Sequence, residues 1–157
     1  LENAPKNAIL VPVDFSLHSE AALKHAAELA ECMKIPLVIL HVVHDPAEMP
    51  GYYTKMLKKK RLAKMEDLAN EMLEEFMKSM IKKHPKLTAL QEATSIMVVG
   101  LPVTRILEVA KRLKPRFVVM GSQGRTGLRN MLLGSKAEQV VKLCKVPVTI
   151  VKTSAKA

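Results

Sequence analysis

Aromatic residues are scarce in this sequence. Tryptophan is absent, and phenylalanine, tyrosine and tryptophan together account for 3% of the 157 residues. The formal net charge of +10, densest between Lys55 and Lys64, raises the hypothesis of nucleic-acid binding. However, few rings are present on which bases could stack, and no recognised nucleic-acid-binding motif occurs. We therefore do not favour a nucleic-acid partner and expect the basic cluster to be a solvated helix face, although small anionic ligands would be attracted.

Cysteine is also rare. The chain has two, Cys32 and Cys144, and neither belongs to a C-x-x-C motif or a Cys/His cluster. This spacing argues against a disulfide or a metal site. Each lies in an apolar helical context, so we expect two buried free thiols, which suits a reducing compartment.

Long apolar runs are missing as well. No segment is apolar enough to span a bilayer, and the first residues do not form a basic and then apolar leader. We therefore expect a cytoplasmic protein with no membrane contact. A chain of this length can bury enough apolar surface to fold alone, and no linker divides it. The expectation is one domain over residues 1–157, with its core at about 6–153.

Short apolar segments alternate with helical patterns along the chain. Helical patterns follow the first four of these segments, with Ser16 or Ser19 as the cap of the first helix and Pro102 opening the third. Parallel strands need such helical crossovers, so the fold class is α/β: an open five-stranded parallel sheet with helices on both faces. The predicted strands are residues 8–13, 37–43, 93–99, 117–120 and 148–151.

Two of the predicted helices carry apolar faces that can be assigned in advance. The helix at about 53–83 has a methionine-rich stripe at helical spacing, which is either a face packed on the core or an adaptable surface for a partner. In the last helix, residues 135–143, Val140 and Val141 are expected to point inward. The stripe of the long helix consists of Met65, Leu68, Ala69, Met72, Leu73, Phe76, Met77 and Met80.

Glycine is infrequent but concentrated. Four of the six glycines lie between Gly121 and Gly134, where a predicted strand ends and a helix begins at Ser135. A backbone without Cβ can lie against a ligand, and the amides at a helix N-terminus attract anions. The order Gly134-Ser135-Lys136 excludes a Walker A loop, and the spacing of Gly121 and Gly124 excludes the dinucleotide motif G-x-G-x-x-G. The remaining pattern is G-x2-G-x9-G-S, which is either a phosphate site or only a turn.

Three segments together resemble the ATP-binding branch of the universal stress protein family. They are Ile9 to Ser16 (ILVPVDFS), Val119 to Gly127 (VMGSQGRTG) and Pro147 to Val151 (PVTIV), in the family's order and spacing. The resemblance covers nearly the whole chain. It implies a Rossmann-like sheet with strand order 3-2-1-4-5, which would set Asp14 opposite the glycine segment. It also implies ATP as the ligand and a homodimer formed through the last strand, Val148 to Val151.

The same resemblance assigns roles around the adenosine half of ATP. Because a carboxylate repels a triphosphate, Asp14 is expected to accept hydrogen bonds from the ribose or the adenine region. The backbone at Val42 would hold adenine, with Pro12 and Val13 alongside, and Met120 would wall the pocket. For the strand residues, ordinary packing is the alternative.

The phosphate half would be held by main-chain amides at Gly121, Gly124, Gly134 and Ser135. The Ser135 hydroxyl would add a donor, act as a helix cap, or do both. Two cations are candidates: Lys136 would neutralise a terminal phosphate or point into solvent, and Arg125 would contact a phosphate or stay solvated. Mg²⁺ or Mn²⁺ would accompany the triphosphate through phosphate oxygens and water, with few protein ligands.

No catalytic residue is predicted. Since His41 and His44 lie three apart on a strand, they point to opposite faces and do not suggest a metal site. Phosphoryl transfer needs a positioned base or water-orienting residue, and none can be named. The leading hypothesis is therefore a non-enzymatic, ATP-binding stress or signalling module. The alternatives are a slow ATPase or phosphotransferase using the same site, and a protein that works through protein or nucleic-acid contacts with the site empty.

Overall fold

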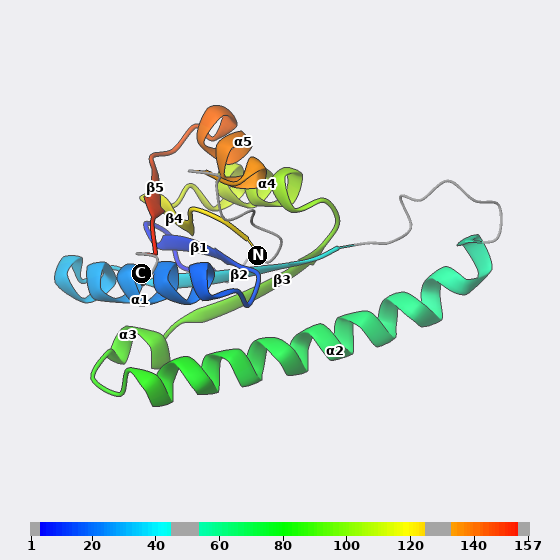
Figure 1. The fold of residues 1–157 in the computed structure, drawn as a ribbon, viewed down its shortest axis with the longest axis horizontal. Helices are drawn as coiled ribbons and strands as arrows, with labels where there is room; N and C mark the ends of the chain where they lie inside the picture. The colour runs from blue at the N-terminus through cyan, green and yellow to red at the C-terminus, as the bar shows by residue number, and fades with distance from the viewer. Residues whose placement is uncertain (1–3, 45–53, 125–132, 154–157) are drawn as a thin grey trace.

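A five-stranded parallel sheet forms the centre of the computed structural model, which describes residues 4–44, 54–124 and 133–153, and of 54–63 only the backbone. The strand order is β3-β2-β1-β4-β5 (Figure 1). The predicted α/β class and the order 3-2-1-4-5 are thereby confirmed. The strands are β1 (Ile9–Val13), β2 (Leu37–Val43), β3 (Thr94–Val99), β4 (Phe117–Gly121) and β5 (Val148–Val151).

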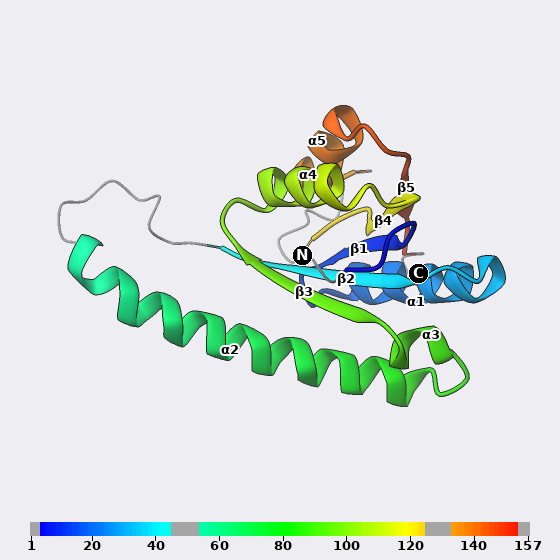
Figure 2. The same ribbon diagram turned by 180° about the vertical axis from the view of Figure 1, so that it is seen from behind.

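Helices cover both faces of the sheet. Helices α1 and α2 lie on one face and α4 and α5 on the other, as the two opposite views show (Figures 1 and 2). A short helix after α2, not predicted from the sequence, packs against α1 and α2. The helices are α1 (Leu17–Met33), α2 (Thr54–Lys83), α3 (Thr88–Gln91), α4 (Pro102–Leu113) and α5 (Ser135–Leu143).

The alternation of strand side chains divides the core into two layers. On β1, Ile9 and Val11 pack toward α1 and α2, whereas Leu10 packs toward α4 and α5. Because both faces are buried, the strands are apolar at nearly every position, which explains why they were visible in the sequence as continuous apolar runs.

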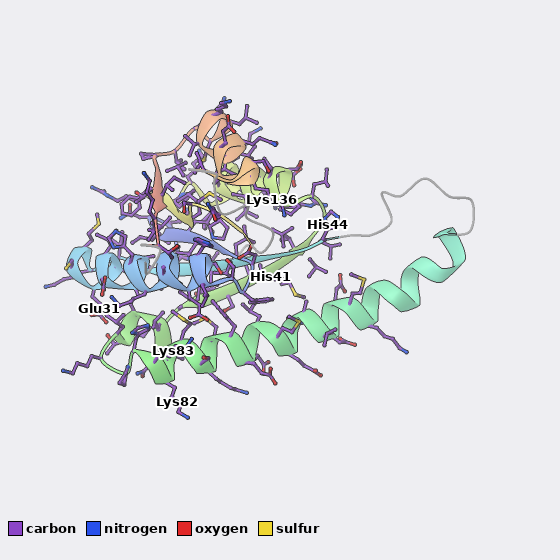
Figure 3. All side chains as sticks on the ribbon, in the orientation of Figure 1. Glu31, His41, His44, Lys82, Lys83 and Lys136 are labelled. Atoms are coloured by element: carbon purple, nitrogen blue, oxygen red, sulfur yellow. The ribbon has the colours of Figure 1, made fainter. Side chains whose placement is uncertain are left out.

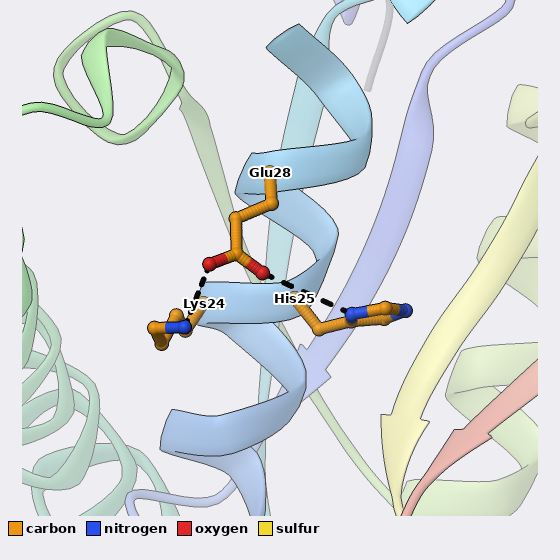
Figure 4. Close-up of polar contacts among 3 residues, drawn as sticks. All are labelled: Lys24, His25 and Glu28. Atoms are coloured by element: carbon orange, nitrogen blue, oxygen red, sulfur yellow. Dashed lines mark hydrogen bonds and ion pairs between the residues drawn. The ribbon is translucent and has the colours of Figure 1, made fainter. Parts of the chain in front are cut away.

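Helix α1 begins as predicted, and Ser16 is the cap. The Ser16 hydroxyl accepts a hydrogen bond from the Ser19 amide at 3.2 Å. Small buried side chains on one face let the helix lie close to the sheet; they are Ala22, Ala26, Ala27 and Ala30. The opposite face carries exposed charges, among them Glu28 between Lys24 (2.6 Å) and His25 (4.0 Å) (Figure 4).

The long helix α2 buries only part of its predicted stripe. Ala69, Leu73, Phe76 and Met80 are buried, as expected for a core-packed face. Leu68 is 57% exposed and Met72 37% exposed, so the core-packed alternative is wrong for these two residues. Consecutive residues are rotated by about 100° around the axis of a helix. A residue can therefore face the sheet while the residue next to it in sequence faces solvent. Figures 1 and 2 show the N-terminal half of α2 extending past the strands.

Three further burial predictions are corrected. Cys32 is exposed, because it lies about 200° around α1 from the buried Ala30. Cys144 is half-buried at the end of α5. Val141 is 44% exposed while Val140 is fully buried, since a short helix on a sheet turns only one of two adjacent residues inward. None of the helices in the described ranges is long and apolar enough to cross a membrane.

Candidate functional site

The carboxyl ends of β1 and β4 meet in the middle of the sheet. From β1 the chain proceeds to β2 and β3 on one side, and then returns to β4 on the other side of β1. Such a reversal opens a crevice beyond the strand ends, where α/β proteins bind ligands. Asp14 follows β1 there, and residues 122–124 follow β4.

Asp14 bridges the two strand ends. Its Oδ1 accepts hydrogen bonds from the Ser16 hydroxyl at 2.6 Å and from the Ser16 amide at 3.2 Å. Its Oδ2 lies against Gly124: a Cβ built on Gly124 would be 2.8 Å from that oxygen. Asp14 therefore faces the glycine segment, as the family resemblance implied, and a side chain at position 124 would require the carboxylate to move.

The start of α5 closes against the same segment. The Gly134 amide, predicted to hold a phosphate, instead donates to the Ser122 carbonyl at 2.7 Å, and a Cβ on Gly134 would lie 3.3 Å from that oxygen. Gly134 is the N-cap of α5, with no side-chain cap bond, and Ser135 and Lys136 are exposed in the first turn (Figure 3). Amides in a first helical turn have no acceptor within the helix, so this end of α5 suits an anion.

One acidic side chain is also close to this helix end. Glu138 is exposed in the first turn of α5 and accepts a hydrogen bond from Lys142 at 2.6 Å. That hydrogen bond and the charge of Lys142 lower the pKa of Glu138. The ion pair partly offsets a negative charge that would otherwise oppose an anion at the helix N-terminus.

Gly121 has a different reason to be glycine. A Cβ there would lie 2.7 Å from the His18 carbonyl oxygen and 2.9 Å from the His18 Cβ. The close approach is thus between β4 and the first turn of α1. The sequence predicts that glycine here lets the backbone lie against a ligand. In the structure, the absence of a Cβ at Gly121 instead lets β4 pack closely against α1.

The predicted adenine-side residues divide between the two faces of the sheet. Val42 and Met120 pack toward α4 and α5, and Pro12 shares that face because it alternates with Val11 and Val13. Val13 is buried in the layer under α1 and α2. Only the backbone of Val13 is therefore near the crevice, whereas Pro12 and Val42 are half-buried on the side of α5.

Two contacts beside Asp14 were not foreseen. The His41 Nδ1 lies 2.9 Å from the Val13 carbonyl oxygen. The His41 ring stacks on Phe15, with ring centroids 4.3 Å apart and planes at 27°. No local signal in the sequence pairs the turn at Asp14 and Phe15 with a histidine of another strand.

One predicted phosphate contact falls on a part of the chain that the structure does not describe. Arg125 lies outside the described residues, as does Gly127. Among the residues that the structure describes, no group of three or more His, Cys, Asp or Glu could hold a metal ion.

An open groove of about 850 Å³ lies at the other end of the sheet, between the end of α1 and α3. Glu31 of α1, labelled in Figure 3, is on its wall. It accepts hydrogen bonds from the Thr88 hydroxyl at 3.1 Å and the Ala89 amide at 3.2 Å. These bonds attach α3 to α1. Because the Glu31 carboxylate is used to join these two helices, we place the functional site at the β1 and β4 ends, where the strand order reverses.

Comparison with known proteins gives a consistent picture. The model of the universal stress protein family matches residues 7–152. Universal stress protein MJ0577 of Methanocaldococcus jannaschii is 32% identical over 152 residues, covering 92% of this chain and 93% of that protein. The solved structure of MJ0577 has a TM-score of 0.68 at 29% identity, covering 98% of this chain and 100% of the other.

Two further solved structures share the fold. Universal stress protein UspA from Lactobacillus plantarum has a TM-score of 0.76 at 23% identity, covering 95% of this chain and 99% of that one. A universal stress protein in complex with cAMP has a TM-score of 0.62 at 21% identity, covering 96% and 100%. At these identities the likeness concerns the fold alone.

Proposed function

This chain belongs to the universal stress protein family, and we propose that it is a member that binds ATP at the carboxyl ends of β1 and β4. One observation carries the proposal. Asp14 Oδ2 lies against Gly124, while the Gly134 amide holds the start of α5 to Ser122, so a carboxylate and a helix N-terminus flank one glycine segment. A carboxylate for a ribose and amides for phosphates are the two chemistries that a nucleotide needs.

In the proposed complex, the phosphates lie on the amides of Gly124 and Ser135, with the Ser135 hydroxyl as a further donor. Lys136, exposed in the first turn of α5, neutralises the terminal phosphate. Mg²⁺ or Mn²⁺ binds through phosphate oxygens and water. A positive charge is needed at this end because the triphosphate carries several negative charges. The nearby carboxylate of Glu138 adds a further negative charge.

The base lies on the α5 side of the sheet, where the half-buried Pro12 and Val42 provide apolar surface and Met120 is buried in the core of that face. Asp14 accepts a hydrogen bond from the ribose. The cAMP complex of a protein with this fold supports the choice of an adenine nucleotide. The preference among ATP, ADP and AMP is a matter for measurement.

We further propose a binding role rather than an enzymatic one. Phosphoryl transfer requires a base or water-orienting group beside the terminal phosphate, and we assign the carboxylate of this crevice, Asp14, to the ribose instead. ATP occupancy would then change the shape or the partners of a cytoplasmic stress or signalling protein. Slow ATP hydrolysis or phosphotransfer in the same site is the competing function.

The test is to purify the protein without added nucleotide and identify what it releases on denaturation by mass spectrometry. We expect adenine nucleotide, and rebinding of ATP with Mg²⁺ in calorimetry. Sustained phosphate release under the same conditions would favour the enzyme. Purified protein that neither carries nor binds an adenine nucleotide would refute the proposal.

A homodimer is the second part of the proposal. Strand β5 is a sheet edge, which the sequence had predicted for Val148 to Val151. Its residues are apolar apart from Thr149, and an uncovered apolar edge invites pairing with another chain. Pairing of two copies along β5 would remove this edge.

A further inference from the structure

The turn between β1 and α1 is held from the neighbouring strand by one side chain. His41 of β2 lies opposite Val13 in the parallel register. Its Nδ1 is 2.9 Å from the Val13 carbonyl oxygen, and its ring stacks on Phe15. His41 therefore contacts the residue before Asp14 and the residue after it.

Phe15 needs this support because its backbone is in the left-handed region, at φ 64°. That conformation is strained for a residue with a large side chain and persists only where the surroundings hold it. The ring of Phe15 is held on one side by His41 and on another by Phe76 of α2, with centroids 5.3 Å apart. The strained turn, in return, sets where the Asp14 carboxylate points.

The outcome of this arrangement is visible at Asp14 itself. One carboxylate oxygen is bound to Ser16, which caps α1, and the other lies against Gly124. A change in the backbone at Val13 or Phe15 would rotate the carboxylate away from the glycine segment. His41 acts on this backbone from inside the protein, because Phe15 packs in the layer under α1 and α2. It therefore does not need to touch a nucleotide to have this effect.

We propose that His41 is a positioning residue for ATP binding, acting through Asp14. This inference rests on the proposed function, because it assumes that Asp14 contacts the ribose. His41 donates its Nδ1 hydrogen to the Val13 carbonyl and supplies the flat surface on which Phe15 is stacked. Both contacts fix the φ and ψ angles around Asp14 before the ligand arrives, which lowers the entropic cost of binding.

Two substitutions separate the two contacts. His41→Phe keeps a ring for Phe15 but removes the donor, whereas His41→Asn keeps a donor but removes the ring. The matched control is His25→Phe, the same exchange on the exposed face of α1, beside Glu28 (Figure 4). Each variant is made with and without Asp14→Ala, and the Kd for ATP is measured by calorimetry at fixed Mg²⁺ after a thermal melt has established folding.

We expect His41→Phe to weaken ATP binding about tenfold and His41→Asn about threefold, with no change for His25→Phe. In the Asp14→Ala background both losses should shrink to less than twofold, because the group being positioned is gone. If His41→Phe does not fold, the His41→Asn cycle decides the question.

Equal losses with and without Asp14 would overturn the inference, as would unchanged ATP affinity in folded variants. Either result would leave ATP binding by the unsubstituted protein intact, and with it the proposed function. Absence of ATP binding in the unsubstituted protein would refute both.

Discussion

At the level of single residues, the glycines near the site have distinct tasks. Gly124 leaves room for the Asp14 carboxylate, and Gly121 lets α1 approach β4. Gly134 lies beside Ser122, where the two ends of the glycine segment are joined by a hydrogen bond. Substitution at each position should therefore fail in a different way.

Gly124→Val should abolish most ATP binding. Even the first carbon of the new side chain would be 2.8 Å from Asp14 Oδ2, so the carboxylate and the segment must separate. The new side chain would also displace the phosphate from the Gly124 amide. Loss of one charge-assisted hydrogen bond of this kind costs about 1.5–3 kcal/mol, or at least about tenfold in affinity. Calorimetry with ATP measures the effect, and a thermal melt checks that the variant is folded. ATP affinity equal to that of the unsubstituted protein would argue directly against the proposed site.

Gly121→Ala should instead lower the free energy of unfolding. The new Cβ would meet the His18 carbonyl oxygen at 2.7 Å, and backbone on both sides cannot give way easily. Overpacking of this kind costs about 1–3 kcal/mol. Gly134→Ala is the comparison, because its nearest contact is 3.3 Å. Urea unfolding should show the larger loss for Gly121→Ala, and the reverse order would contradict this account of the packing.

At the level of elements, α2 shows how a helix can be longer than the core that it covers. Its described buried residues fall between Ala69 and Met80, although the helix extends from Thr54 to Lys83. Lys83 at its end bonds to Glu20 of α1 at 2.7 Å, which joins the two helices of this face. Packing therefore fixes the C-terminal half of α2 to the body of the protein.

Leu73→Ala and Leu68→Ala should differ sharply in stability. Leu73 is 5% exposed and Leu68 57% exposed, while both exchanges conserve helix propensity. Truncation at Leu73 should cost about 2–5 kcal/mol, and truncation at Leu68 about 0.5 kcal/mol or less. Chemical denaturation measures both. A cost at Leu68 as large as that at Leu73 would mean that a partner covers this face of α2 in solution.

At the level of the whole molecule, the sheet has two edges, β3 and β5. Strand β5 is short and pairs with β4 over Val118 to Gly121. Short edges and charged edge residues are the usual protection against unwanted pairing, yet β5 carries no charge within Val148 to Val151. The proposed dimer supplies that protection by pairing.

Thr149→Lys should convert the proposed dimer to a monomer. Two copies paired along β5 would bring the new charges close together, and lysine on an edge strand opposes pairing. Light scattering coupled to size exclusion measures the mass. Leu143→Lys is the control, since Leu143 is an exposed apolar residue of α5 outside the strand. A monomer for the unsubstituted protein at working concentration would remove the dimer from the proposal.

Most of the elements could be predicted from the sequence because their signals are local. Apolar runs marked the strands to within about a residue, Ser16 marked the start of α1, and Pro102 marked α4. The glycine segment marked the candidate site. Burial of adjacent helical residues was harder to predict. Val141 was expected to point inward beside Val140, because an apolar pattern does not resolve a rotation of one residue, about 100°.

By itself, the sequence determined the alternation of strands and helices, the position of the glycine segment and, through its motifs, the family. The resemblance also implied that Asp14 faces the glycine segment, but only the tertiary structure decided that Gly121 serves packing against α1 and that His41 holds the turn at Phe15. The physical reason is the range of the interactions. Helix caps and strand propensities involve neighbours in the chain, whereas these contacts join residues that become neighbours only when distant strands pair and fix the register.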